Sequence, residues 1–200
     1  MKRVGIYGGS FDPPHMGHLL LAESAREELV LEKVFFVPAR QTPLKDRFPL
    51  AAPENRWEML NLSVEGNPFF ATSRVELDRE PPSYTITTVR YFRRRFPEAE
   101  LWLILGEDIL EEFHRWYRYR ELLQLTGVSV GKRPGCQRKF PAALEEYREK
   151  ICFFPHPGIE ISSQGIRDRI RKGQSVKYRL PEKVREYIVK CRLYTEGSKE

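Results

Sequence analysis

Residues 3–18 read RVGIYGGSFDPPHMGH and join a short apolar segment to the beginning of a helical pattern. The first part, residues 3–7, has the length and apolar content of a strand. The junction that follows, residues 8–18, holds two prolines and two of the chain's four histidines. The next segment, residues 17–29, carries apolar side chains at the spacing of one helix face, at Leu21, Ala22, Ala25 and Leu29. This order of strand, loop and helix is typical of the first unit of an α/β fold.

The same alternation of strand-like and helix-like segments continues along the chain. Further strands are predicted at residues 33–37, 69–73, 101–105, 128–130 and 151–154. Helices are predicted at residues 53–64, 83–95, 107–114, 118–123, 163–171 and 181–191. The pattern predicts a doubly wound, Rossmann-like, mainly parallel sheet with helices on both faces and a small C-terminal helical part. Ligands of such folds bind at the carboxyl ends of the strands, near the point where the strand order reverses.

The composition is that of a folded globular protein with an excess of positive charge. The chain has 200 residues, of which 40% are hydrophobic and 31% charged, and its net charge is +6 at pH 7. We expect one domain over residues 1–196, an insertion over residues 132–150, and a loose tail over residues 197–200. The positive balance favours acidic partners such as nucleotides or nucleic acid.

Three observations bear on location. The longest apolar run of the strand-like parts, residues 101–105 (LWLIL), is too short to span a bilayer, so we expect no membrane partner. Residues 1–3 lead directly into a strand-like segment, so we expect no secretory signal. The three cysteines are scattered and odd in number, which favours a reducing cytoplasm over a disulfide framework.

The paired histidines of residues 8–18 have three interpretations. They fall on one side of a helix start and could share a metal ion, but no HExxH pattern, nearby cysteine or further histidine before His114 supports that. They could instead cap or pack, with Asp12 making a turn before Pro13. Alternatively, their N–H groups could donate to phosphate oxygens that gain charge in a transition state. A loop between a strand's carboxyl end and a helix amino terminus suits phosphate, although the GxxxxGK[ST] and GxGxxG patterns are absent.

Two motifs resemble the signatures of the HxGH nucleotidyltransferases. Residues 8–18 (GGSFDPPHMGH) resemble the first signature, and residues 161–167 (ISSQGIR) resemble the second, ISSTxxR. The resemblance implies catalytic roles for His15, His18 and Arg167: the histidines bind the phosphates of ATP, His18 stabilises the α-phosphate during transfer, and Arg167 clamps the pyrophosphate side. It also implies further ATP contacts from Gly8, Gly9, Ser10, Phe11, Ser162 and Ser163.

Other segments are similar to the nicotinate-nucleotide adenylyltransferases, and this resemblance covers residues 2–194. The segments are residues 37–39 (VPA) followed by Lys45, residues 83–85 (SYT), residues 106–108 (GED) with Trp116, and residues 133–135 (RPG). It implies that Gly106 and Asp108 approach the ribose of ATP. It implies a second set of residues that bind nicotinate mononucleotide, namely Lys45, Tyr84, Thr85, Trp116 and Arg133. From composition alone, Trp116 could equally pack in the core. Leu44, Thr87 and Gln164 depart from the family's pattern.

The implied reaction joins ATP and nicotinate mononucleotide to give deamido-NAD and pyrophosphate. A phosphate monoester is already largely dianionic near neutral pH, so the attack needs neither a general base nor a covalent residue. Mg²⁺ is implied with ATP, held largely by phosphate oxygens and water, so we expect no dedicated protein metal site. The alternatives are transfer to nicotinamide mononucleotide or phosphopantetheine, and a nucleotide- or RNA-binding module without turnover. Under the enzyme interpretation we expect no nucleic-acid partner.

Overall fold

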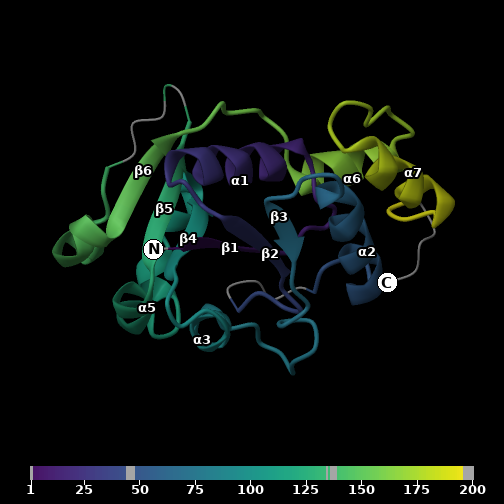
Figure 1. Ribbon diagram of the computed structural model, residues 1–200. Coiled ribbons are helices and arrows are strands. Elements are labelled where there is room, and N and C mark those ends of the chain that lie inside the picture. The colour runs from purple at the N-terminus through teal and green to yellow at the C-terminus, as the bar shows by residue number, and fades with distance from the viewer. Residues whose placement is uncertain (1, 44–47, 134, 136–138, 196–200) are drawn as a thin grey trace.

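The structure, a computed structural model, describes residues 2–43, 48–133, 135 and 139–195, which form a six-stranded sheet of order β3-β2-β1-β4-β5-β6. The strands are β1 (Arg3–Gly9), β2 (Lys33–Pro38), β3 (Phe70–Thr72), β4 (Glu100–Gly106), β5 (Gly127–Lys132) and β6 (Ile151–Pro155). All neighbouring strands of the sheet run parallel. The predicted doubly wound, Rossmann-like fold is therefore confirmed (Figure 1).

The strand order reverses at β1. Ile6 of β1 is level with Phe35 of β2 on one side and with Leu103 of β4 on the other. The chain thus builds the sheet first through β2 and β3 and then, in the opposite direction, through β4, β5 and β6. The loop after β1 and the residues after β4 consequently lie where doubly wound folds bind ligands.

Helices cover both faces of the sheet, as Figure 1 shows with α1 above it and α3 and α5 below it. The first face carries α1 (Met16–Glu28) and α2 (Pro53–Val64), and the second carries α3 (Thr85–Arg95), α5 (Tyr119–Leu125) and the 3₁₀ helix η2 (Ala142–Lys150). Ala22 of α1 and Leu60 of α2 share one buried apolar cluster, whereas Phe92 of α3 and Leu122 of α5 belong to another. None of the described helices is long and apolar enough to cross a membrane.

The last two helices, α6 (Ser163–Arg171) and α7 (Glu182–Lys190), form the expected small C-terminal part. They lie beside α2 (Figure 1). Met59 of α2, Ile166 of α6 and Ile188 of α7 are buried in one apolar cluster. This packing brings Tyr194 close to the start of α2, since Tyr194 and Ala51 both donate to Asp12 in the loop after β1.

Two predicted helices differ from the structure in their start or continuity, and the expected insertion contains a 3₁₀ helix. The helix expected over residues 83–95 begins at Thr85 with Tyr84 as N-cap, because Ser83 Oγ instead accepts a hydrogen bond from the Arg40 backbone N–H at 3.0 Å. The helix expected over residues 107–114 consists of two short pieces, α4 (Glu107–Leu110) and the 3₁₀ helix η1 (Phe113–Arg115). The expected insertion over residues 132–150 contains η2, whose Leu144 is fully buried in the core under α5 and the sheet.

The packing of α7 predicts a contrast between two adjacent residues. Ile188 is 3% exposed and Val189 is 66% exposed. Ile188→Ala should lower the free energy of unfolding by about 2–4 kcal/mol, because it leaves a cavity in the cluster shared with α2. Val189→Ala should change it by less than about 0.5 kcal/mol. Urea unfolding of both variants measures the difference, and equal losses would show that the C-terminal helices do not depend on this cluster.

Candidate active site

The two histidines of the first loop stack on each other at the amino end of α1. His15 is the N-cap residue of α1, and its ring centroid lies 3.6 Å from that of His18, with the rings 25° apart. The Nδ1 atom of His18 accepts a hydrogen bond from the backbone N–H of His15 at 3.1 Å. A neutral imidazole that accepts at Nδ1 carries its proton on Nε2, so His18 keeps an N–H donor for another partner.

Both histidines are held in the neutral form. Burial lowers the pKa of His15 from 6.5 to about 4. Burial, and then the neighbouring His15, lower the pKa of His18 well below its usual value. Two neutral rings can stack without charge repulsion, and each offers one N–H donor. The Nδ1 atom of His15 is buried without a hydrogen-bond partner among the described residues.

The residues before the histidines are shaped by a left-handed turn and by Asp12. Phe11 has a φ of 47° and is 1% exposed, and its ring meets those of Tyr7 and His18 edge-on. Asp12 is 4% exposed. Its Oδ2 accepts from the Leu50 backbone N–H at 2.8 Å, and its Oδ1 accepts from the Ala51 backbone N–H at 3.1 Å.

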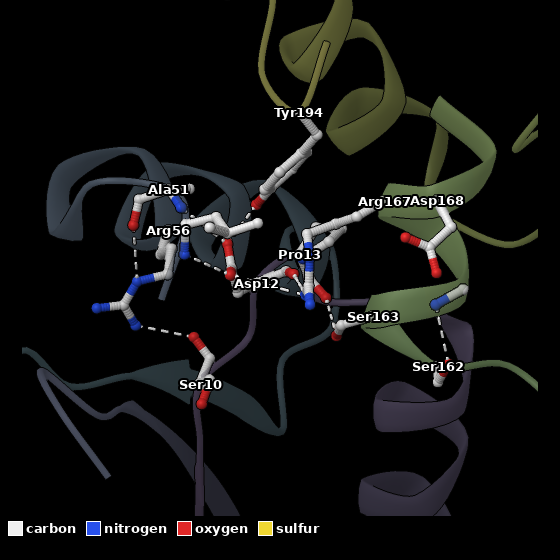
Figure 2. Close-up of polar contacts among 12 residues, drawn as sticks. Ser10, Asp12, Pro13, Ala51, Arg56, Ser162, Ser163, Arg167, Asp168 and Tyr194 are labelled. Atoms are coloured by element: carbon white, nitrogen blue, oxygen red, sulfur yellow. Dashed lines mark hydrogen bonds and ion pairs between the residues drawn. The ribbon is translucent and has the colours of Figure 1, made fainter. Parts of the chain in front are cut away.

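A buried arginine and a tyrosine from the end of the chain complete this arrangement. The Nη1 atom of Arg56 donates to the carbonyls of Ser10 and Ala39, each at 2.8 Å, and its Nε donates to the carbonyl of Ala51 at 3.3 Å. The hydroxyl of Tyr194 donates to Asp12 Oδ1 at 2.7 Å. Figure 2 shows Arg56 and Tyr194 converging on the loop from different elements.

The second motif lies directly against the first (Figure 2). Ser163 Oγ donates to the carbonyl of Pro13 at 2.8 Å. The Nη1 atom of Arg167 donates to the carbonyl of Asp12 at 2.6 Å and lies 3.7 Å from Asp12 Oδ2. Ser162 caps α6, because its Oγ accepts from the Gly165 backbone N–H at 3.1 Å. The Nε atom of Arg167 is buried without a partner in the described part of the chain.

The end of β4 faces the same loop. Gly106 is the N-cap of α4, and a Cβ at this position would lie 2.7 Å from Oδ1 of the exposed Asp108. The charge of Asp108 contributes, after burial, to a raised pKa of Tyr7 at the end of β1. The carboxylate therefore lies near the carboxyl ends of β1 and β4, where doubly wound folds bind ligands. Gly8 has open space where a side chain would project, whereas a Cβ at Gly9 would lie 3.1 Å from the Phe11 ring.

The expected nicotinate mononucleotide residues are only partly brought together. Tyr84 and Thr85 form the amino end of α3, and the Tyr84 ring lies 4.7 Å from the ring of Tyr117, next to Trp116. Trp116 is half-buried and packs on Phe113, with ring centroids 5.0 Å apart. The sequence analysis did not single out Tyr117, although a second aromatic residue directly after Trp116 was a signal that could have found it.

Of the remaining two residues of that set, the structure describes Arg133 alone. Arg133 is exposed after β5, and its charge, together with burial as the larger cause, lowers the pKa of His156. Lys45 and the departure at Leu44 lie outside the described residues. Thr87 and Gln164, the other two departures, are both exposed, in the first turns of α3 and α6.

No cluster of three or more His, Cys, Asp or Glu side chains that could hold a metal ion occurs among residues 2–43, 48–133, 135 and 139–195. The carboxylate of Asp12, within the histidine loop, accepts from two backbone N–H groups and a tyrosine hydroxyl. Its oxygens are therefore used within the protein. The groups that remain for a ligand are mainly N–H donors, which suit phosphate oxygens rather than a cation.

Comparisons with known proteins agree with this geometry. Residues 6–169 match the model of the family described as Cytidylyltransferase-like. The nicotinate-nucleotide adenylyltransferase of Bacillus subtilis is 38% identical over 194 residues, covering 97% of this chain and 99% of that protein. A "Probable nicotinate-nucleotide adenylyltransferase" of Dictyoglomus turgidum is 40% identical over 196 residues, covering 97% of this chain and 96% of that protein.

A solved structure shows the same fold at lower identity. It is the Plasmodium falciparum nicotinic acid mononucleotide adenylyltransferase complexed with NaAD, with a TM-score of 0.76, 18% identity, and coverage of 97% of this chain and 98% of that one. The likeness extends over the whole sheet and the C-terminal helices. Together with the two motifs that meet at Asp12 and Pro13, these matches show that the chain belongs to the cytidylyltransferase-like family and, within it, to the nicotinate-nucleotide adenylyltransferases.

Proposed function

We propose that the protein transfers the adenylyl group of ATP to nicotinate mononucleotide, giving deamido-NAD and pyrophosphate. The observation that carries this proposal is the meeting of residues 8–18 with α6, which gathers N–H donors at the carboxyl ends of β1 and β4. The names of the relatives supply the acceptor, and Tyr84, Thr85 and Trp116 are the residues that we assign to it.

In this reaction a phosphate oxygen of nicotinate mononucleotide attacks the α-phosphorus of ATP. A new P–O bond forms there, and the bond to the β-phosphate oxygen breaks, so that pyrophosphate leaves with the electron pair. The attacking phosphate is largely dianionic near neutral pH and needs no base. Mg²⁺ enters with ATP as part of that substrate and is held by phosphate oxygens and water. The protein's contribution is positioning and charge stabilisation.

On the ATP side of the site, some residues donate hydrogen bonds to the phosphates and others hold the surrounding backbone in place. The Nε2–H of His18 donates to the α-phosphate, where charge develops, and His15 donates beside it. Arg167 binds the leaving pyrophosphate with the part of its guanidinium that Asp12 does not use. The backbone of Gly8, Gly9, Ser10 and Phe11 lines the approach, Ser162 and Ser163 hold the amino end of α6 there, and Gly106 and Asp108 face the ribose.

The acceptor side uses the amino end of α3. The backbone N–H of Thr85, the first residue of α3, is assigned to the nicotinate carboxylate, because the first N–H groups of a helix have no partner within it. The backbone N–H of Tyr84 donates to the Pro82 carbonyl at 3.0 Å, so Tyr84 is assigned to the same ligand through its side chain. A neutral amide would gain less from the same groups, which favours the acid. The ring of Trp116 stacks on the pyridine ring, and Lys45 and Arg133 bind the phosphate of the mononucleotide.

Pyrophosphate release tests the proposal directly. With ATP and Mg²⁺, release should be fastest with nicotinate mononucleotide and at least tenfold slower with nicotinamide mononucleotide or phosphopantetheine. A preference for phosphopantetheine would overturn the acceptor assignment. Absence of release with all three, with retained binding of ATP or RNA, would instead support the binding-module alternative.

A histidine variant tests the role of the loop. His18→Ala should lower kcat/KM about 10²- to 10³-fold, because it removes one donor to the charge that develops on the α-phosphate. His114→Ala, at an exposed histidine of η1, serves as the control and should stay within twofold. Steady-state kinetics and a circular dichroism spectrum of each variant measure this. Equal activity of the two variants would contradict the assignment.

The neutral state of the histidines predicts a pH dependence of stability. His15 has a pKa of about 4 in the folded protein and an ordinary value of 6.5 in the unfolded chain. Between these values the unfolded chain binds more protons, so stability is present above pH 6.5 and is lost as the pH falls toward 4. The loss from His15 amounts to at most about 3 kcal/mol. Unfolding of His15→Gln should show a shallower dependence between pH 7 and 4 than the wild type or His114→Ala, and an unchanged slope would refute it.

A further inference from the structure

The carboxylate of Asp12, in the first motif, is contacted by residues from three other segments of the chain. Backbone N–H groups of Leu50 and Ala51 reach it from the segment before α2. Arg167 of α6 lies on the opposite side, 3.7 Å from Oδ2. The third segment contains Tyr194, 182 positions away in the sequence, whose hydroxyl donates to Oδ1 at 2.7 Å (Figure 2). No role in the transfer follows for Tyr194 from either motif.

Tyr194 acts on this carboxylate as a permanent donor. It is 5% exposed. Burial, followed by the charge of Asp12 and the hydrogen bond to it, raises the pKa of the phenol far above its usual value. The hydroxyl therefore keeps its proton at any pH at which the enzyme works, and a carboxylate oxygen can only accept from it. With Oδ1 held by Tyr194 and Ala51, the plane of the carboxylate is set and Oδ2 faces Arg167.

Asp12 holds Arg167 through two contacts. Its Nη1 donates to the backbone carbonyl of Asp12 at 2.6 Å and is also attracted by the Asp12 carboxylate. Both contacts lie on one edge of the guanidinium, and the buried Nε has no partner in the described part of the protein. A rotation of the Asp12 side chain would therefore change the direction in which the free part of Arg167 points.

Tyr187 provides a comparison, because its hydroxyl makes a hydrogen bond that lies away from the site. Tyr187 of α7 donates its hydroxyl to Asn55 Oδ1 of α2 at 3.0 Å. That bond joins the C-terminal helices to α2 without touching Asp12, Arg167 or the histidine loop. Both tyrosines thus donate a hydroxyl from the same C-terminal part, but only that of Tyr194 donates to the carboxylate beside Arg167.

We propose that Tyr194 is a positioning residue for adenylyl transfer: through its hydrogen bond to Asp12 it orients Arg167 toward the pyrophosphate that leaves. This inference rests on the proposed function, because it concerns the efficiency of that reaction. A misplacement of a substrate-binding group by a fraction of an ångström is enough to slow a reaction whose catalysis is mainly positioning. The effect is smaller than that of removing a donor that touches the substrate.

The test compares two matched variants that each lose one hydroxyl. Tyr194→Phe should lower kcat/KM for ATP about tenfold and weaken pyrophosphate binding at least threefold, whereas Tyr187→Phe should leave both within twofold. Thermal midpoints of the two variants show whether folding is affected similarly. Equal kinetics of Tyr194→Phe and Tyr187→Phe would overturn the proposal, and so would a Tyr194→Phe protein that does not fold, since the hydroxyl would then serve stability.

A double-mutant cycle tests whether Tyr194 acts through Arg167 or through a general loss of rigidity in the site. If Tyr194 acts through Arg167, Tyr194→Phe should cost less than twofold in kcat/KM when Arg167 is already alanine. A tenfold loss in that background would show that the hydroxyl acts by another route. Pyrophosphate binding, measured by calorimetry, does not require turnover. If the wild type fails to use nicotinate mononucleotide, the proposed function is refuted, but the pyrophosphate affinities of the two tyrosine variants still decide the role of Tyr194.

Discussion

The carboxylate of Asp12 is the buried group on which the arrangement of the site depends. A carboxylate withdrawn from water needs several donors, because its desolvation is costly unless hydrogen bonds replace the lost water. Leu50 and Ala51 supply two of them from the start of α2, and Tyr194 supplies a third from the end of the chain. One side chain in the first loop thereby fixes the entry to α2 and the C-terminal part, and both then determine where α6 and Arg167 lie.

Arg56 fixes the backbone around the same loop. Its guanidinium is fully buried, and burial lowers its pKa while the charge of Asp12 opposes that shift. Its donors bind carbonyls in three segments, those after β1, after β2 and before α2. A planar group with several fixed donors is suited to this task, and a lysine could not satisfy the same carbonyls in the same geometry. Asp12 and Arg56 together hold the loops at the carboxyl ends of β1 and β2.

The features that could be predicted from the sequence are those written in a local pattern. The alternation of strands and helices, the histidine loop and the helix that begins at Ser163 all follow from neighbouring residues, and the structure has each of them. That Ser163 and Arg167 bind the carbonyls of Pro13 and Asp12 could not be predicted, because backbone acceptors leave no mark in the sequence.

Contacts between residues far apart in the sequence could not be predicted for a related reason. Arg56 occupies a position in α2 that the composition of the helix does not distinguish from a solvated one, yet it is fully buried. Tyr194 lies beyond the last predicted helix, residues 181–191, where no pattern in the sequence pointed to a contact with Asp12. The misplaced start of α3 has the same origin, since Ser83 looked like a local cap but binds the distant backbone of Arg40. Tertiary partners thus overrode local preference where the chain serves the site.

The unsatisfied atoms of the site explain why so much structure surrounds one loop. His15 Nδ1 and Arg167 Nε are buried without partners in the described part of the protein, and such atoms destabilise a fold by roughly 1–3 kcal/mol each. A flexible loop would relieve this cost by turning these groups toward water. Asp12, Arg56 and the helix α6 prevent that relaxation, because each fixes a different part of the loop or its neighbour. In the proposed reaction this rigidity would hold the histidines and Arg167 in place before ATP arrives, and the stability of the C-terminal packing would offset its cost.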